Sequence, residues 1–239
     1  MPITKADVLE VLGDPVLKRM FFFVGVIAVS AEEYSNVGDY ISDGDIGVVP
    51  GKISTAFYSG YRNTIETQAG DPPLALADRS QILHECTHAI VDINALDVER
   101  VKDEVAAYLA QLTFIVLSNP KFDFGPSVHP AIHGSPFGEL MWSIFQIVRK
   151  YNLHNEKGFG ARISELDIWN LTRELHAVPD YAHIKETEKT GGDAKDLLGI
   201  TSGVPIKNNQ MRALKAAMRL AQRTKRPRTY SPSPRLMIF

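Results

Sequence analysis

Residues 84–88 read His-Glu-Cys-Thr-His and place two histidines four positions apart. Residues with this spacing lie on one face of an α-helix, so both imidazoles can reach the same metal ion. Glu85 is turned aside from the two histidines, where its carboxylate can act on a water molecule at the metal. The pattern therefore predicts a catalytic metal site with His84 and His88 as ligands and Glu85 as the general base.

A catalytic zinc ion usually takes three protein ligands and keeps one position open. The residues after His88 contain neither the Gly nor the His of the longer HExxHxxGxxH motif. A glutamate from the next expected helix is the alternative, and Glu99 and Glu104 are the candidates. Glu104 is favoured because it lies beside the apolar stripe of that helix, where a carboxylate needs a cation. Glu99 falls in the first turn, where it complements the helix dipole, and Asp103 is expected nearer the solvent.

The segment HECTHAIVDINA, followed after a short loop by Asp103-Glu104, resembles the gluzincins, the thermolysin-like zinc metallopeptidases. The resemblance covers about residues 60–117 and is greatest to the compact minigluzincins. It implies that Zn²⁺ is held by His84, His88 and Glu104, and that Glu85 assists attack of a zinc-bound water on a peptide bond. It also implies that Asp103 orients a ligand histidine.

The same resemblance implies that the substrate lies against an edge strand, which would be residues 63–68. Two features differ from thermolysin: the gap between His88 and Glu104 is shorter, and the downstream histidine motif is missing. The residue that stabilises the oxyanion is therefore left open among five candidates, which are Tyr58, Tyr61, His129, His133 and His154.

The elements that must position these residues can be read from turn signals and apolar periodicity. Short strands are expected at 45–49, 53–58 and 63–68. Helices are expected from Asp78 to about 93, from Asp97 to about 117, from Ser135 to about 151, and from Ser164 to before Pro179. The pattern predicts an α+β fold. A small, mostly antiparallel sheet packs on the HExxH helix and the following ligand helix, and the C-terminal part is helical.

Composition agrees with a folded domain. The chain has 239 residues, of which 44% are hydrophobic and 23% charged, which excludes wholesale disorder, a collagen-like repeat and a coiled-coil rod. Its single cysteine, Cys86, excludes an internal disulfide and a cysteine-rich zinc site. Any zinc is then held by histidine and carboxylate, as in open catalytic sites.

The net charge of −2 conceals a division of the chain. Residues 207–239 carry nine Lys or Arg and no Asp or Glu, so this segment has a charge of +9 and residues 1–206 have −11. We predict a zincin-like metallopeptidase domain over 1–206 and a basic C-terminal helix and tail over 207–239. The basic segment can dock on the acidic body, an anionic membrane surface or a partner protein. No aromatic platform or known motif supports nucleic acid as its partner.

The longest apolar run, residues 20–29, is too short to span a bilayer, so no transmembrane segment is expected. It resembles the apolar core of a signal peptide, but the preceding acidic residues Asp7, Glu10 and Asp14 oppose that interpretation. The alternative is a buried element, in which Asp14 and Pro15 open a helix that continues into the run. A cytoplasmic protein or an exported effector is expected.

Two functions are consistent with these features. The first is a zinc metallopeptidase that hydrolyses a protein or peptide substrate. The second is a non-catalytic zincin-fold binding protein that acts through its basic C-terminal tail. The intact Glu85 favours the first, because a scaffold would not need it.

Overall fold

The computed structural model describes residues 2–50, 56–67, 73–122, 135–184 and 188–189. The chain divides into two units, Met1–Ala194 and Lys195–Phe239, and the description below concerns the first. The predicted boundary at residue 206 and the basic helix after it lie outside the described residues, as do His129 and His133. Within the described ranges, no helix combines the length and the apolar character needed to cross a membrane.

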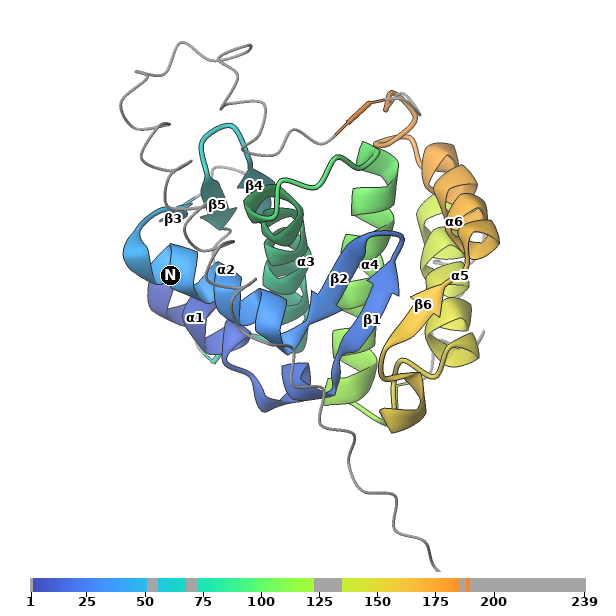
Figure 1. Ribbon diagram of the computed structural model, residues 1–239, viewed down its shortest axis with the longest axis horizontal. Coiled ribbons are helices and arrows are strands. Elements are labelled where there is room, and N and C mark those ends of the chain that lie inside the picture. The colour runs from blue at the N-terminus through green and yellow to red at the C-terminus, as the bar shows by residue number, and fades with distance from the viewer. Residues whose placement is uncertain (1, 51–55, 68–72, 123–134, 185–187, 190–239) are drawn as a thin grey trace, which may run out of the picture. The chain divides into compact units, whose positions relative to one another are not determined.

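Two long helices, α3 (Leu76–Ile93) and α4 (Arg100–Ser118), lie side by side at the centre of this unit (Figure 1). Ala106 and Ala107 of α4 are fully buried, and their small side chains allow the two helices to approach closely. This pairing places the HExxH motif of α3 against the helix that carries Glu104. Both helices were predicted from the sequence.

The starts of these two helices differ from the prediction. Helix α3 begins at Leu76 and α4 at Arg100, and neither N-terminus has a side-chain cap hydrogen bond. Asp78 lies in the first turn of α3 instead of capping it, and Asp97 precedes the start of α4. An acidic residue is favourable both at the cap and within the first turn, so its position alone does not mark the start.

Helices α5 (Pro136–Lys150) and α6 (Glu165–Ala177) begin as predicted. Ser135 accepts a hydrogen bond from the N–H of Gly138, and Ser164 accepts one from the N–H of Asp167. Both helices form the helical C-terminal part of the unit, and each packs against α4.

The apolar run at 20–29 is a β-hairpin, so the predicted helix through it is wrong. Asp14 does cap a helical turn, but this is the short 3-10 helix η1 (Pro15–Arg19). Strands β1 (Phe21–Val24) and β2 (Ile27–Ser30) follow and pair antiparallel. Gly25 adopts a φ of 57° in the turn between them, a conformation that glycine enters without strain. The run is nevertheless a buried element, as the alternative to a signal peptide required, because alternate residues of both strands are buried.

The strands of the described residues form two mixed three-stranded sheets in place of the predicted single, mostly antiparallel sheet. The first has the order β2-β1-β6, with β6 (Ala161–Ile163) parallel to β1. The second has the order β3-β5-β4, in which β5 (Thr64–Thr67) pairs parallel with β3 (Gly47–Pro50) and antiparallel with β4 (Phe57–Ser59). The coarser α+β prediction is confirmed.

Two N-terminal helices complete the unit. Helix α1 (Lys5–Leu12) and helix α2 (Ala31–Asp43) pack on each other and on α3. Helix α2 was not predicted, and it lies in the chain between β2 and β3. The first sheet packs against α4 and the second against α3, so both sheets support the central helix pair.

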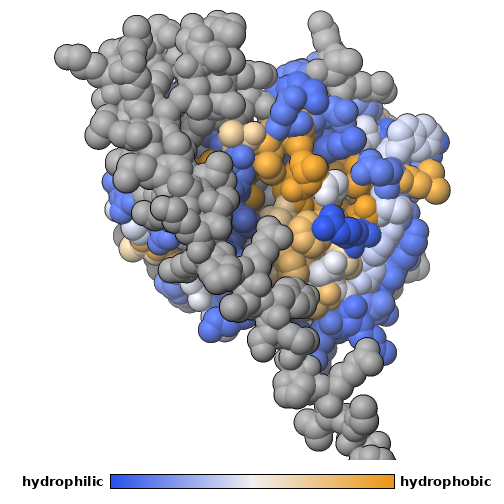
Figure 2. All heavy atoms as spheres, viewed as in Figure 1, coloured by the Kyte–Doolittle hydropathy of each residue, from blue (hydrophilic) through white to orange (hydrophobic). Residues whose placement is uncertain are grey.

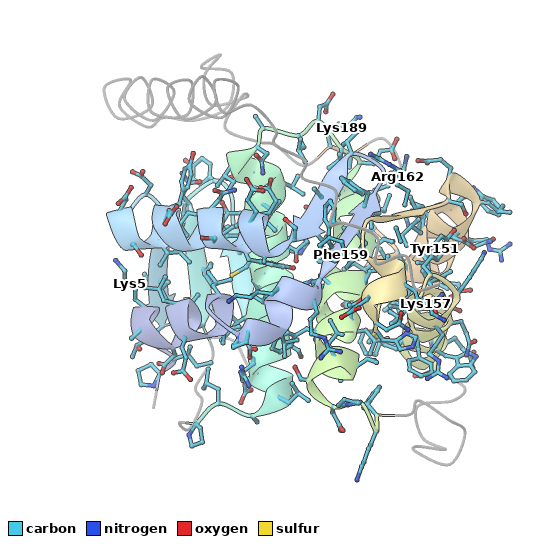
Figure 3. The ribbon with its side chains drawn as sticks, turned by 60° about the horizontal axis from the view of Figure 1, so that its bottom comes forward. Lys5, Tyr151, Lys157, Phe159, Arg162 and Lys189 are labelled. Carbon is cyan, nitrogen blue, oxygen red and sulfur yellow. The ribbon has the colours of Figure 1, made fainter. Side chains whose placement is uncertain are left out.

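The outer face of the first sheet carries aromatic side chains. Figure 2 shows apolar side chains gathered over β1 and β2. Phe21 contacts the ring of Phe159, and Arg162 lies 4.2 Å from the centroid of the Phe23 ring. Figure 3 shows Phe159 and Arg162 beside the hairpin.

Candidate metal centre

The central helix pair brings His84, His88 and Glu104 together. Their Nε2 and carboxylate oxygen atoms all lie within 4.8 Å of one another. The two Nε2 atoms are 3.3 Å apart, and Glu104 Oε2 lies 3.5 Å from that of His84 and 3.7 Å from that of His88. The histidines meet because they are one helical turn apart on α3, and Glu104 meets them because α4 packs on that face.

These distances fit one metal ion. Ligand atoms at about 2.0–2.1 Å from a tetrahedral zinc ion are separated by roughly 3.3–3.4 Å. Glu104 Oε2 is buried and accepts no hydrogen bond from the described residues. Converging lone pairs in a buried place are costly unless a cation lies between them. His84, His88 and Glu104 could therefore hold a metal ion.

Asp103 lies next to this group. Its Oδ1 is 2.9 Å from Nδ1 of His88, so it can hold the ring with Nε2 facing Glu104. Asp103 is only 2% exposed, so the expectation that it lies nearer the solvent is wrong. The reason is that α3 covers this face of α4 as well as the face of Glu104.

The charge on His88 and the charge on Glu104 stabilise each other in the absence of a metal ion. Burial lowers the pKa of His88, but the carboxylates of Asp103 and Glu104 outweigh it and raise that pKa to about 10. Burial opposes ionisation of Glu104, whereas His88 and His84 favour it and bring its pKa to about 2. The metal-free site therefore keeps a proton on His88 and a charge on Glu104, and a metal ion must displace that proton.

Glu85 lies beside the same group but makes a different contact. It is 7% exposed, and burial raises its pKa despite the opposing influence of His84 and His88. Its Oε2 accepts a hydrogen bond of 2.7 Å from the backbone N–H of Tyr58 in β4. A carboxylate with a raised pKa, next to a candidate metal centre, is suited to take up a proton.

The strand next to Glu85 is β4, so the expectation that residues 63–68 form the edge strand is wrong. Strand β5 within that range is the central strand of its sheet, and β3 and β4 occupy its two sides. The sequence indicates which segments are extended, but the order of strands depends on how the sheet packs against α3.

Of the five oxyanion candidates, three are among the described residues, and their side chains have other surroundings. The hydroxyl of Tyr58 donates to Asp92 Oδ2 at 2.7 Å, and Tyr61 is 62% exposed in the turn after β4. His154 lies after α5, where its Nε2 is 3.1 Å from the side-chain amide of Asn155. His129 and His133 are outside the described residues.

Two tyrosines that were not among the candidates lie at the site. The ring of Tyr108 packs against that of His84, with centroids 4.5 Å apart, and its hydroxyl is 2.6 Å from the Tyr181 hydroxyl. Burial raises the pKa of Tyr108 to about 12 and also raises that of Tyr181, so both hydroxyls keep their protons. Tyr108 follows Glu104 by one helical turn, which is a local signal. Tyr181 follows α6, and its sequence position gives no such signal.

No family model, curated protein or solved structure matches this chain. The resemblance to the gluzincins therefore stays a prediction from the sequence. The case for a metal centre depends on the residues described above and on their geometry.

Proposed function

We propose that this chain is a zinc-dependent metallopeptidase. One observation carries the proposal: the ligand atoms of His84, His88 and Glu104 converge beside the buried carboxylate of Glu85. Two histidines and one carboxylate are a usual ligand set for a catalytic zinc ion with an open position. The zincin-like arrangement of the domain and the identity of the metal are parts of the same proposal.

The residues then have distinct roles. Zinc held by His84, His88 and Glu104 would act as a Lewis acid toward a water molecule and the scissile carbonyl. Glu85 takes the proton of the water and passes it to the leaving amine. Asp103 keeps the ring of His88 in its ligand orientation.

The substrate in this proposal is an extended peptide segment alongside β4. Strand β4 has only β5 as a partner among the described strands, and its backbone is bonded to Glu85. The N–H of Tyr58 on this side of β4 is already bonded to Glu85. A peptide here would therefore lie next to the general base without a main-chain hydrogen bond to that group.

The test is the substitution Glu85→Gln, which keeps the shape of the side chain and removes the base. We expect chelator-sensitive peptide hydrolysis to fall by about 10²–10⁴-fold while zinc content stays near one ion per chain. His84→Ala, His88→Ala and Glu104→Ala should lose the zinc instead. Glu99→Gln is the matched control, because Glu99 pairs with Lys102 at the start of α4 and should change neither readout.

Hydrolysis retained in Glu85→Gln would refute the assignment of the base. A wild-type chain that binds zinc but shows no chelator-sensitive cleavage would favour the non-catalytic alternative. That alternative depends on residues 207–239, which lie outside the described residues.

A further inference from the structure

The geometry points to Tyr58 and Asp92 as a positioning pair that holds strand β4 against α3 and thereby fixes the Glu85 carboxylate. This inference rests on the proposed function for its catalytic consequence. Its structural part is the hydrogen bond from the residue 58 amide to Glu85, which can be tested without measuring peptidase activity.

Tyr58 is bonded to α3 at both ends. Its backbone N–H donates to Glu85 Oε2 and its hydroxyl donates to Asp92 Oδ2, each at 2.7 Å. Glu85 and Asp92 are seven residues apart, which is close to two helical turns, so they lie on one side of α3 about 10 Å apart along its axis. All three residues are less than 8% exposed. Tyr58 therefore binds α3 at two points that lie two helical turns apart, and one of these points is the proposed base.

The backbone bond to Glu85 is made on the side of β4 that faces away from β5. Tyr58 is paired with Ile65 of β5, but its N–H points to α3. Successive residues of a strand point their N–H groups to opposite sides, so Phe57 and Ser59 face β5 and Tyr58 faces the helix. Strand β4 spans Phe57–Ser59, and its central residue joins it to α3 through both of these hydrogen bonds.

The Asp92 bond sets the position of the Tyr58 backbone. The Tyr58 hydroxyl and the Asp92 carboxyl group are both buried, so losing this 2.7 Å bond costs more than losing one at the surface. The hydroxyl of Tyr58 is therefore committed to Asp92, and the residue acts through Glu85. A displacement of about 1 Å at a reacting group can reduce a rate by about 10²-fold, so a loosened β4 should slow the chemical step.

The first experiment compares Tyr58→Phe and Asp92→Leu with Tyr34→Phe in the full zinc-loaded chain. Tyr34 is the matched control because its buried hydroxyl also bonds to α3, but at Thr87, 2.9 Å from its Oγ1, and not at Glu85 or Asp92. We expect kcat for a peptide substrate to fall about tenfold or more in the first two variants, with KM and zinc content unchanged. The double variant should be no slower than the slower single variant.

Asp92→Asn keeps an oxygen that can accept the Tyr58 hydroxyl, so it should retain most of the wild-type kcat. A Tyr58→Phe variant as active as Tyr34→Phe would overturn the catalytic consequence. So would a double variant whose two losses in kcat multiply.

The second experiment measures hydrogen exchange at the residue 58 amide in the zinc-free chain by NMR. This amide should be protected in the wild type and in Tyr34→Phe. Its exchange should be about tenfold faster or more in Tyr58→Phe and Asp92→Leu, because the N–H then separates more often from Glu85. Unchanged protection in both variants would overturn the inference. If the wild type has no peptidase activity, the proposed function fails while this measurement still decides the positioning pair.

Discussion

Zinc binding to His84, His88 and Glu104 should weaken steeply as the pH is lowered from 8 to 6. The cause is His88, whose pKa the neighbouring carboxylates of Asp103 and Glu104 raise to about 10 in the metal-free site, against the effect of burial. His88 is therefore protonated across this range, and a metal ion can bind its Nε2 only by displacing a proton. Because the pKa is raised, the proton competes more strongly at each lower pH.

The magnitude follows from one displaced proton. Below the pKa of His88, the apparent affinity should fall about tenfold for each pH unit, which is about 100-fold between pH 8 and pH 6. The assay is competition with a chromophoric chelator of known affinity at pH 6, 7 and 8, with ionic strength held constant. Calorimetry in two buffers with different protonation enthalpies counts the protons released.

Asp103→Asn is the informative variant. It removes the charge 2.9 Å from His88 Nδ1, so the pKa of His88 should fall, which an NMR titration of the zinc-free chain measures. An affinity that changes less than about threefold between pH 6 and 8 in the wild type would refute the reasoning. An unchanged His88 pKa in Asp103→Asn would refute the role given to that carboxylate.

Two further predictions concern stability. Ser164→Ala removes the side-chain cap of α6 and should lower the free energy of unfolding by about 1 kcal/mol, measured by urea denaturation, whereas Ser164→Thr should keep it because its hydroxyl can still cap the helix and donate to Asp167. Equal midpoints for the two variants would contradict that role. Gly158→Ala places a Cβ in collision with the backbone carbonyl of Asn152 and should cost about 1–3 kcal/mol. Gly13→Ala is its control, because the nearest atom there is 3.4 Å away, and an equal loss in both variants would contradict the clash.

Helices were predictable where local chemistry marks their ends. Ser135 and Ser164 cap α5 and α6 through their own hydroxyls, a bond that depends only on residues three positions away. A serine also caps α2, where the Ser30 hydroxyl accepts a hydrogen bond from the N–H of Glu33, although this helix was not predicted. The acidic residues Asp78 and Asp97 gave wrong starts because they are favourable at more than one position near a helix start.

The apolar hairpin could not be predicted from its pattern. Residues 20–29 are apolar at almost every position, so neither the helical period nor strand alternation is visible there. The structure shows that every second residue is buried, because the inner face of the sheet packs against α4 and the outer face does not. The two faces of the hairpin therefore differ in burial only once the sheet packs against α4.

The sequence by itself determined the pairing of His84 with His88 and the place of Glu85 beside them, because both follow from the period of one α-helix. Only the tertiary structure decided that Glu104 meets both histidines, that Asp103 contacts His88, and that β4 is the strand beside Glu85. These relations join residues on different elements. They depend on how α3, α4 and the second sheet pack together, which local spacing does not specify.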